Sequence, residues 1–379
     1  MARYKLSDVV MRIKDKVDKD NTDLEFYIGG EHFDNGEICI TKRGVIKEST
    51  IGPAFHMRFK PGDVLLMSRN PHLRKAGVVD FEGICSDVSY VCRTKDENVL
   101  MQRFLPFIFQ TDDFWKFAEE NKGGSTNFFL NWSDFERYEF ELPSIEKQRQ
   151  LTEILWAAQN AKLAYLELLR QTDELVKSQF IELFGDIPVE DYKSLSEVCK
   201  IITDGTHQPP KFVDKGIPFL LVSNITGNII TYDTPKYITQ ETYDILMKRT
   251  PIEIGDILLS TVGSYGHPAI VKDNTPFSFQ RHIAYLKPDV SKINSVYLHT
   301  AILSEDVQNQ IEVLVLGVAQ KTLNLSAIRG IKIPVPSLER QLSFNTLVEQ
   351  TDKSKFEIKK AIENTSALIK SLMQQDLST

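Results

Sequence analysis

The chain has 379 residues, of which 42% are hydrophobic and 26% charged, and its formal net charge is −7, from 45 Lys and Arg against 52 Asp and Glu. This composition is typical of a globular protein with two or three domains. The negative charge argues against simple nonspecific nucleic-acid binding, because phosphate binders usually carry a basic excess. Any DNA-facing surface must therefore be a local patch, with a basic partner supplying part of the phosphate contact.

The sequence also argues against a membrane protein and against a metal-binding protein. The longest apolar runs, 104–109 and 311–318, are too short or too interrupted to cross a bilayer, and the first seven residues lack the apolar core of a secretory signal. We therefore expect a cytoplasmic protein without a membrane partner. The cysteines show no CxxC spacing and no histidine at zinc-site spacing, which predicts reduced, mostly buried thiols and no metal site. They are Cys39, Cys85, Cys92 and Cys199.

The first half of the chain is predicted to be a mixed α and β domain followed by a long helix. Within residues 1–144, strands are expected at 63–68 and 88–92 and a helix at about 99–119. Residues 145–185 then show helical periodicity without a proline. Ser144 is suited to cap the start of this helix, and Gly185 with Pro188 to end it.

The second half has the same plan. Residues 186–336 contain predicted strands at 217–222, 256–260 and 282–286 and a predicted helix at 295–312, and residues 337–379 form a second long helix with Ser337 as its N-cap. The apolar stripes of the two long helices superimpose when one is shifted by 193 residues. Two such helices should pack against each other, and we predict that they run antiparallel.

An internal repeat underlies this symmetry. Residues 62–66 (GDVLL) return as 255–259 (GDILL), 130–133 (LNWS) as 323–326 (LNLS), and 142–148 (LPSIEKQ) as 335–341 (VPSLERQ), all 193 residues later. A weaker echo, 6–9 (LSDV) against 195–198 (LSEV), lies at an offset of 189. The period far exceeds that of solenoid repeats. The sequence therefore predicts an α+β protein with a duplicated domain, able to contact two similar sites.

No catalytic site is predicted. Residues 70–72 (NPH) are similar to the Asn-Pro-Pro-aromatic loop of amino-methyltransferases but lack the second proline and the aromatic residue. Residues 263–267 lack the spacing of phosphate-binding loops.

Polar loops with basic and aromatic residues are the remaining candidates. Arg and Lys suit guanine edges and Gln suits adenine, so these loops are candidates for reading DNA, although a solvated loop is equally consistent with any single residue. The candidate DNA contacts in the second half are Thr206, His207, Gln208, Lys211, Tyr265, His267, Arg281, Gln320 and Lys321. Those in the first half are Arg69, His72, Arg74, Lys75, Ser125, Thr126 and Asn127.

The order of these motifs closely resembles the specificity subunit of type I restriction-modification enzymes. The resemblance is carried by the DGTH loop at 204–207, the GDILL strand at 255–259 and the run from Gly317 to Gln341, and with the duplicated copy it covers essentially the whole chain. The first domain departs from the pattern, because it has no DGTH loop and has Thr126 and Asn127 where the second has Gln320 and Lys321.

The resemblance implies an architecture and a function. It implies target-recognition domains at 1–144 and 186–336, separated by conserved helical regions at 145–185 and 337–379 that form an antiparallel coiled coil. Each domain would read one half of a split, asymmetric site in double-stranded DNA, and the helices would set the unread spacer. The same helices would dock two modification subunits, and the residues expected to take part are Ile154, Leu155, Tyr165, Leu347, Ile358 and Leu372.

The resemblance also implies that this chain is not an enzyme and binds no cofactor. The modification subunits would hold S-adenosylmethionine and methylate adenine, and restriction subunits with ATP and magnesium could join them. Two alternatives remain: a stand-alone DNA methyltransferase or nuclease, which would bind S-adenosylmethionine or cut DNA by itself, and an interaction scaffold that does not bind nucleic acid.

Overall fold

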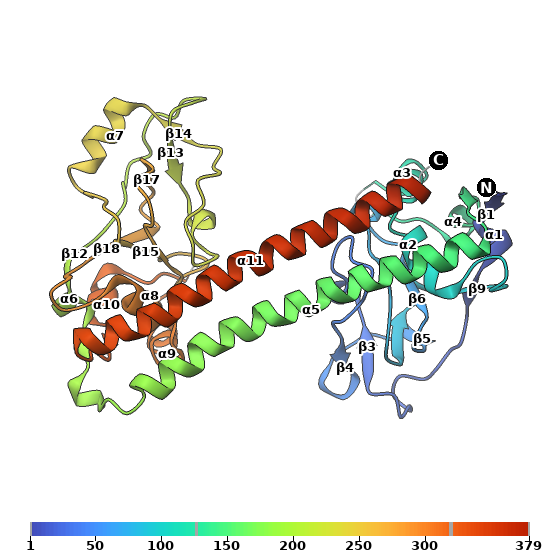
Figure 1. The fold of residues 1–379 in the computed structure, drawn as a ribbon, viewed down its shortest axis with the longest axis horizontal. Helices are drawn as coiled ribbons and strands as arrows, with labels where there is room; N and C mark the ends of the chain where they lie inside the picture. Colours follow the sequence, from blue (N-terminus) through green and yellow to red (C-terminus); the bar gives the residue numbers. More distant parts are fainter. Residues whose placement is uncertain (1, 126–127, 318–320, 378–379) are drawn as a thin grey trace. The chain divides into compact units, whose positions relative to one another are not determined.

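The computed structural model describes residues 2–125, 128–317 and 321–377. Its contacts divide the chain into two compact units (Figure 1). Unit 1 comprises residues 1–167 and 359–379, and unit 2 comprises residues 168–358. The two long helices predicted from the sequence are present as α5 (Ile145–Phe184) and α11 (Leu338–Leu377), and each contributes one part to each unit.

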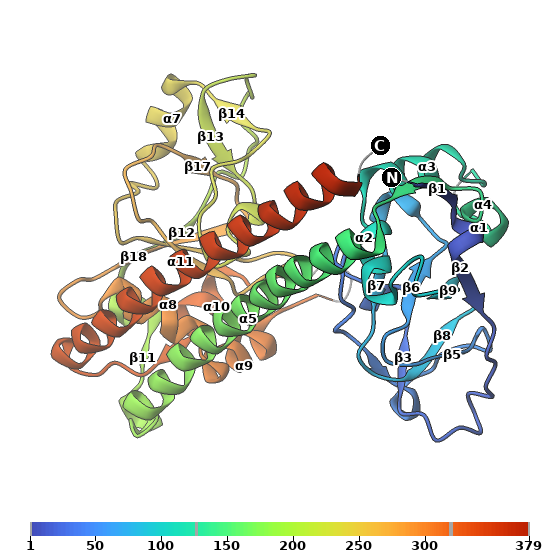
Figure 2. The ribbon, with the colours of Figure 1, turned by 45° about the vertical axis from the view of Figure 1, so that its right-hand side comes forward.

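Unit 1 is built on two sheets (Figure 2). One is antiparallel with the order β2-β9-β6-β7, and the other has the order β4-β3-β8-β5, in which β3 and β8 are parallel. A separate pair, β1 with β10, joins the start of the chain to the strand that precedes α5. The strands are β1 (Ala2–Lys5), β2 (Val10–Ile13), β3 (Phe26–Ile28), β4 (Gly44–Val45), β5 (Phe55–Phe59), β6 (Val64–Met67), β7 (Ala76–Val78), β8 (Gly83–Ser86), β9 (Ser89–Thr94) and β10 (Glu139–Leu142). The helices before α5 are α1 (Leu6–Val9), η1 (Gly30–His32), η2 (Ile46–Glu48), η3 (Pro71–Leu73), η4 (Gln102–Phe104), α2 (Leu105–Ile108), α3 (Asp112–Glu120) and α4 (Trp132–Phe135).

Unit 2 repeats this topology. Its antiparallel sheet has the order β12-β18-β15-β16, its second sheet the order β14-β13-β17 with β13 and β17 parallel, and β11 pairs with β19. The strands are β11 (Lys193–Ser194), β12 (Cys199–Asp204), β13 (Ile217–Leu220), β14 (Tyr237–Ile238), β15 (Ile257–Ser260), β16 (Pro268–Ile270), β17 (Ser278–Phe279), β18 (Ile283–Pro288) and β19 (Lys332–Ile333). The helices are η5 (Val189–Asp191), α6 (Leu195–Val198), η6 (Val222–Asn224), α7 (Gln240–Met247), α8 (Ser295–Leu303), α9 (Glu305–Leu314) and α10 (Leu325–Gly330). The domain duplication predicted from the sequence is thus confirmed, although no described strand of unit 2 corresponds to β5.

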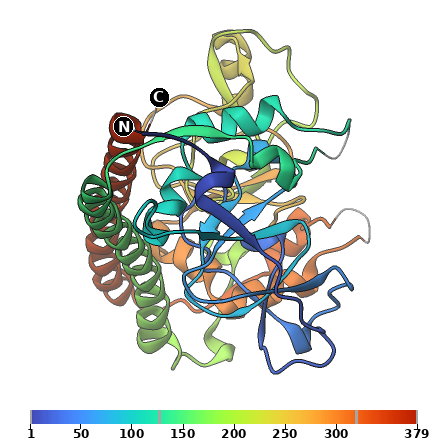
Figure 3. The ribbon, with the colours of Figure 1, turned by 90° about the vertical axis from the view of Figure 1, so that its right-hand side faces the viewer.

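The long helices pack together inside each unit. In unit 1 the buried side chains of Leu155, near the start of α5, and of Ile369 and Met373, near the end of α11, belong to one core, and Figure 3 shows the two helices side by side. In unit 2 the end of α5 meets the start of α11, where the rings of Phe180 and Phe344 lie 5.7 Å apart. The helices therefore run antiparallel in each unit, as the superimposable stripes predicted.

Two predicted helices are interrupted in the structure. The stretch 99–119 is broken between α2 and α3 because the Thr111 side chain accepts a hydrogen bond from the backbone N–H of Phe114 and begins a new helix. The stretch 295–312 is likewise divided into α8 and α9, and Ser304 caps the second by accepting from Val307. Both are N-caps inside an otherwise continuous apolar pattern, which periodicity alone does not reveal.

The cysteines are free thiols in the structure. Cys85 and Cys92 are buried, and Cys39 and Cys199 are half-buried. Burial raises the pKa of Cys39 to about 11 and that of Cys199 to about 12, so both are protonated at neutral pH. Among the described residues, no helix is both long and apolar enough to cross a bilayer.

Candidate nucleic-acid interface

The candidate residues of unit 2 gather at one end of the β12-β18-β15-β16 sheet. A row of paired residues crosses the sheet there: Asp204, Ala284, Leu259 and Pro268. Because neighbouring strands are antiparallel, the loops 205–211, 261–267 and 280–282 all leave the sheet close to this row. The segment around Thr322 joins them through isolated bridges to Val262 and Leu316. The structure therefore brings together loops that lie up to about a hundred residues apart in the sequence.

The DGTH loop is fixed against the neighbouring loop by close backbone packing. Gly205 lies so near residues 279–280 that a Cβ atom on it would come 2.3 Å from the carbonyl oxygen of Phe279 and 2.4 Å from that of Gln280. The backbone N–H of Thr206 donates to the Phe279 carbonyl oxygen at 3.3 Å. Only glycine permits this approach, which places Thr206 beside the loop that carries Arg281.

Asp204 organises an imidazole and a guanidinium at this end. Its carboxylate is only 13% exposed, and it accepts hydrogen bonds from His207 Nε2 at 2.8 Å and from Arg249 Nη2 at 2.6 Å. Arg249 was not predicted from the sequence. It lies just after α7 and 45 residues from Asp204, so no local motif marks it.

The guanidinium of Arg281 is also held by a neighbouring side chain. Its Nε donates to His282 Nε2 at 3.2 Å, so the imidazole acts as an acceptor. Burial, and then the charge of Arg281, lower the pKa of His282, which favours the neutral imidazole that this bond requires. The guanidinium of Arg281 is thereby held while its side chain remains exposed.

Lys321 and Tyr265 form a cluster with Glu312. The Lys321 ammonium donates to the Tyr265 hydroxyl at 3.2 Å, and that hydroxyl donates to the Glu312 carboxylate at 2.8 Å. The Tyr265 hydroxyl and the Glu312 carboxylate raise the pKa of Lys321. Lys321 is thus partly neutralised within the chain.

The other residues predicted to contact DNA in unit 2 differ in their exposure. His267 Nδ1 donates to Asn228 Oδ1 at 3.2 Å, and His267 is half-buried. Gln208 and Lys211 are exposed beyond the DGTH loop. Gln320 lies outside the described residues.

The predicted loop of unit 1 occupies the equivalent end of the equivalent sheet. Arg69 and Gly123 both bridge to Phe129, just as Val262 and Leu316 bridge to Thr322 in unit 2, 193 residues later. Arg69, His72 and Ser125 are exposed there. Thr126 and Asn127 lie outside the described residues.

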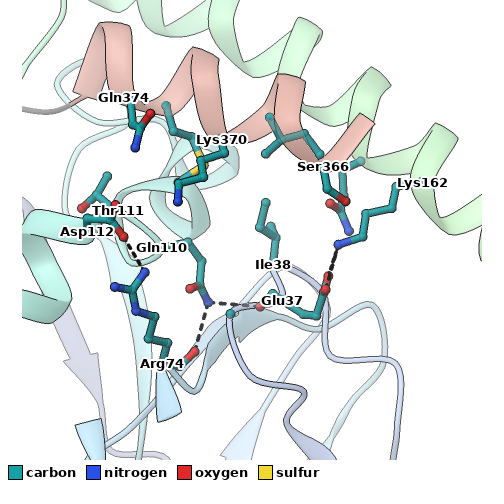
Figure 4. Close-up of a pocket in the computed structure, with 14 residues that line it drawn as sticks. Glu37, Ile38, Arg74, Gln110, Thr111, Asp112, Lys162, Ser366, Lys370 and Gln374 are labelled. Atoms are coloured by element: carbon teal, nitrogen blue, oxygen red, sulfur yellow. Dashed lines mark hydrogen bonds and ion pairs between the residues drawn. The ribbon is translucent and has the colours of Figure 1, made fainter. Parts of the chain in front are cut away.

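Two basic residues of this loop are engaged inside unit 1. Lys75 Nζ donates to the Gly30 carbonyl oxygen at 2.6 Å, and Arg74 Nη1 donates to Asp112 Oδ1 at 2.5 Å. Figure 4 shows that Arg74 points toward Asp112 in a cavity of about 200 Å³, which Lys162 and Lys370 also line. The hydrogen bond from Arg74 lowers the pKa of Asp112. Arg74 and Lys75 therefore hold the loop in place, and their expected role as DNA contacts receives no support from this geometry.

The residues predicted to dock a partner are divided between core and surface. Leu155 and Ile358 are only 1% and 9% exposed, so their side chains are core residues of units 1 and 2 and are not available at the surface. Ile154 is 50% exposed. Tyr165, Leu347 and Leu372 are half-buried, and the last two pack against the cores.

Comparison with known proteins shows what the chain is similar to. Residues 189–365 match the family model of the type I restriction modification DNA specificity domain. The matched stretch makes up 177 of the 379 residues, so the similarity to this domain is shown for the second part of the chain. It is 29% identical over 174 residues to the type I restriction enzyme EcoBI specificity subunit of Escherichia coli, a match that covers 46% of this chain and 36% of the relative.

A second relative and a solved structure extend the comparison. The MjaVIII specificity subunit of Methanocaldococcus jannaschii is 24% identical over 256 residues, which covers 60% of each chain. The match therefore spans less than two thirds of the length of either specificity subunit. The crystal structure of the type I S subunit from M. genitalium superimposes with a TM-score of 0.57 at 14% identity, covering 99% of this chain and 96% of that one. This likeness shows that the two proteins share a fold.

Proposed function

We propose that this chain is the DNA specificity subunit of a type I restriction-modification complex, in which each unit reads one half of a bipartite, asymmetric site. The observation that carries the proposal is the repeated interface. The same set of loops, closed by the same pair of isolated bridges, lies at the same end of the same sheet in both units. These loops expose side chains able to contact bases or phosphates, among them Arg69 and Arg281.

The long helices are the proposed docking surface for two modification subunits, with restriction subunits joining that assembly. Several large apolar side chains remain exposed on them in each unit. In unit 1 these are Ile154, Leu166 and Leu368, and in unit 2 they are Leu168, Leu175, Ile181, Leu183, Leu342 and Phe356. Exposed apolar side chains that gather on one surface are a common feature of protein interfaces. Basic partner surfaces would also offset the net charge of −7 when DNA is bound.

The chemistry of the complex belongs, on this proposal, to the partners. The modification subunits would bind S-adenosylmethionine and methylate adenine N6, the restriction subunits would use ATP and magnesium, and this chain would contribute recognition alone. The target base would have to leave the helix stack to reach a partner's active site. The two helices, each of 40 residues or about 60 Å at 1.5 Å per residue, would set the number of unread base pairs.

Sequencing of methylated bases in host cells with and without the gene tests the proposal. We expect N6-methyladenine in a split motif to disappear when the gene is deleted and to return with a plasmid copy. An unchanged methylation pattern would contradict the proposal and favour the scaffold. If the purified chain alone methylated or cut DNA, the stand-alone enzyme would replace it.

A further inference from the structure

We propose that Arg249 is a DNA-phosphate contact of unit 2 and that the buried carboxylate of Asp204 holds it in position. The inference rests on the proposed function and adds to it a residue outside the sequence motifs. Arg249 follows α7, whereas Asp204 ends β12 and begins the DGTH loop.

Asp204 has two hydrogen-bonded partners where one would compensate its charge. A carboxylate that is 13% exposed needs compensation, and a single ionic hydrogen bond can supply it. Asp204 instead accepts from both His207 and Arg249, whose side chains are 57% and 52% exposed. Each of these two side chains therefore keeps a solvent-facing side while one edge is fixed by the carboxylate.

The Arg249 guanidinium has more hydrogen-bond donors than Asp204 uses. A guanidinium carries five N–H donors. In the described structure only Nη2 of Arg249 is engaged, by Asp204 Oδ1 at 2.6 Å and, weakly, by Thr203 Oγ1 at 3.5 Å. The donors on Nη1 and Nε are left for a ligand, and a planar fork of this kind matches two oxygens of a phosphate.

The loops beside Asp204 expose few negative charges. The two loops that meet at this end of the sheet, 204–208 and 280–282, contain Asp204 as their one acidic residue, and its charge is buried. Their exposed members include His207 and Arg281. An anion approaching Arg249 therefore meets further potential donors and no exposed carboxylate from these two loops.

The geometry favours phosphate over a base edge. A base-reading side chain extends from the protein into a DNA groove. Arg249 instead lies back against the end of β12, bonded to Asp204 and close to Thr203. A guanidinium held at the surface in this way suits the DNA backbone, which runs along the outside of the duplex.

The experiment uses the full chain with its partner subunits and a duplex that contains the methylation site mapped in cells. Binding is measured by fluorescence anisotropy over a range of salt concentrations for the wild type, Arg249→Gln, and Lys193→Gln as the matched control. Lys193 is an exposed lysine in β11, before the opposite end of β12, so its replacement removes the same charge elsewhere.

We expect Arg249→Gln to weaken binding about 5- to 10-fold near 0.1 M salt and to reduce the salt slope by about 0.9, the value for one lost phosphate contact. The loss should be equal for the mapped duplex and for a duplex with an altered second half-site, and Lys193→Gln should bind like the wild type. Unchanged binding by Arg249→Gln would overturn the proposal and leave a structural ion pair. Altered base preference at one position would overturn it in favour of base reading.

A second variant tests the positioning role of Asp204. Removing a negative charge near DNA strengthens binding if the charge acts only by repulsion. We expect Asp204→Asn to weaken binding instead, because the amide has one acceptor oxygen and no charge, so it cannot accept from both Arg249 and His207 as the two carboxylate oxygens do. Tighter binding by Asp204→Asn would contradict the positioning role. Absence of site-specific binding by the wild type would contradict the proposed function itself. The wild-type measurement therefore distinguishes failure of the proposed function from failure of the Arg249 proposal.

Discussion

Gln148 and Gln341, 193 residues apart, make the same three hydrogen bonds in the two units. Gln148 Nε2 donates to the carbonyl oxygens of Val99 and Pro143, and its Oε1 accepts from the backbone N–H of Met101. Gln341 repeats this set with Lys292, Pro336 and Asn294.

These two glutamines fasten each long helix to its globular domain. Both are fully buried and lie near the first turn of α5 and of α11. A side-chain amide has both the donors and the acceptor that such a site needs, so neither a carboxylate nor an apolar residue of similar size can replace it.

We predict that Gln341→Leu destabilises unit 2 by about 2–4 kcal/mol, because it leaves buried backbone groups without partners. Hydrogen exchange should quicken at residues 292–294 and stay unchanged at 99–101. Gln148→Leu is the matched variant, and its effect should fall on 99–101 instead. Equal effects of either variant on both segments would show that the glutamines do not act locally.

Gly205→Ala is predicted to abolish recognition of the half-site that unit 2 reads on the proposed function. The added Cβ would lie 2.3–2.4 Å from two carbonyl oxygens, so the DGTH loop would have to move away from the loop that carries Arg281. Gly263→Ala is a useful comparison, because a Cβ there meets nothing within 4 Å although its φ of 75° imposes backbone strain. Methylation of plasmids that carry the mapped site measures both variants. Normal methylation by Gly205→Ala would show that the close contact is not needed.

The sequence was sufficient to predict the duplication, both long helices and the loops that would meet, because these depend on periodicity and on repeated motifs. It could not predict what individual side chains do. Arg74 belongs to a basic run typical of a DNA contact, yet its guanidinium is bonded to Asp112, 38 residues away. Arg249 lies in no motif, yet it shares the carboxylate of Asp204. Such pairings are decided by tertiary packing.

Arg69 and Arg74 should therefore respond differently to the same substitution. Arg69→Gln removes an exposed cation and should weaken DNA binding with little change in stability. Arg74→Gln breaks the partly exposed pair with Asp112 and should lower the stability of unit 1 by at most about 1 kcal/mol. Anisotropy with the mapped duplex and thermal unfolding separate the two effects. Equal losses of affinity at unchanged stability would instead make Arg74 a direct DNA contact.

His299 should make unit 2 less stable in acid. Burial lowers the pKa of the imidazole below its ordinary value of 6.5. Hydrogen bonds to the backbone of Asn228, whose carbonyl oxygen lies 3.2 Å from Nε2, and of Pro268 oppose this shift but do not cancel it. The charges of Lys272 and Asp352 have smaller effects of opposite sign. Below pH 6.5 the unfolded chain therefore binds this proton more readily than the folded chain, so stability falls as the pH falls, by at most about 1.4 kcal/mol per pH unit.

His299→Gln should remove this contribution, so that its stability changes less than that of the wild type between pH 7.5 and pH 5.5. Chemical denaturation followed by the fluorescence of tyrosines and tryptophans at the two pH values measures the difference, with His72→Gln in unit 1 as the control for an exposed histidine. If His299→Gln and the wild type lost the same stability in acid, the acid sensitivity of unit 2 would have to come from other groups, because only the substituted imidazole distinguishes the two proteins.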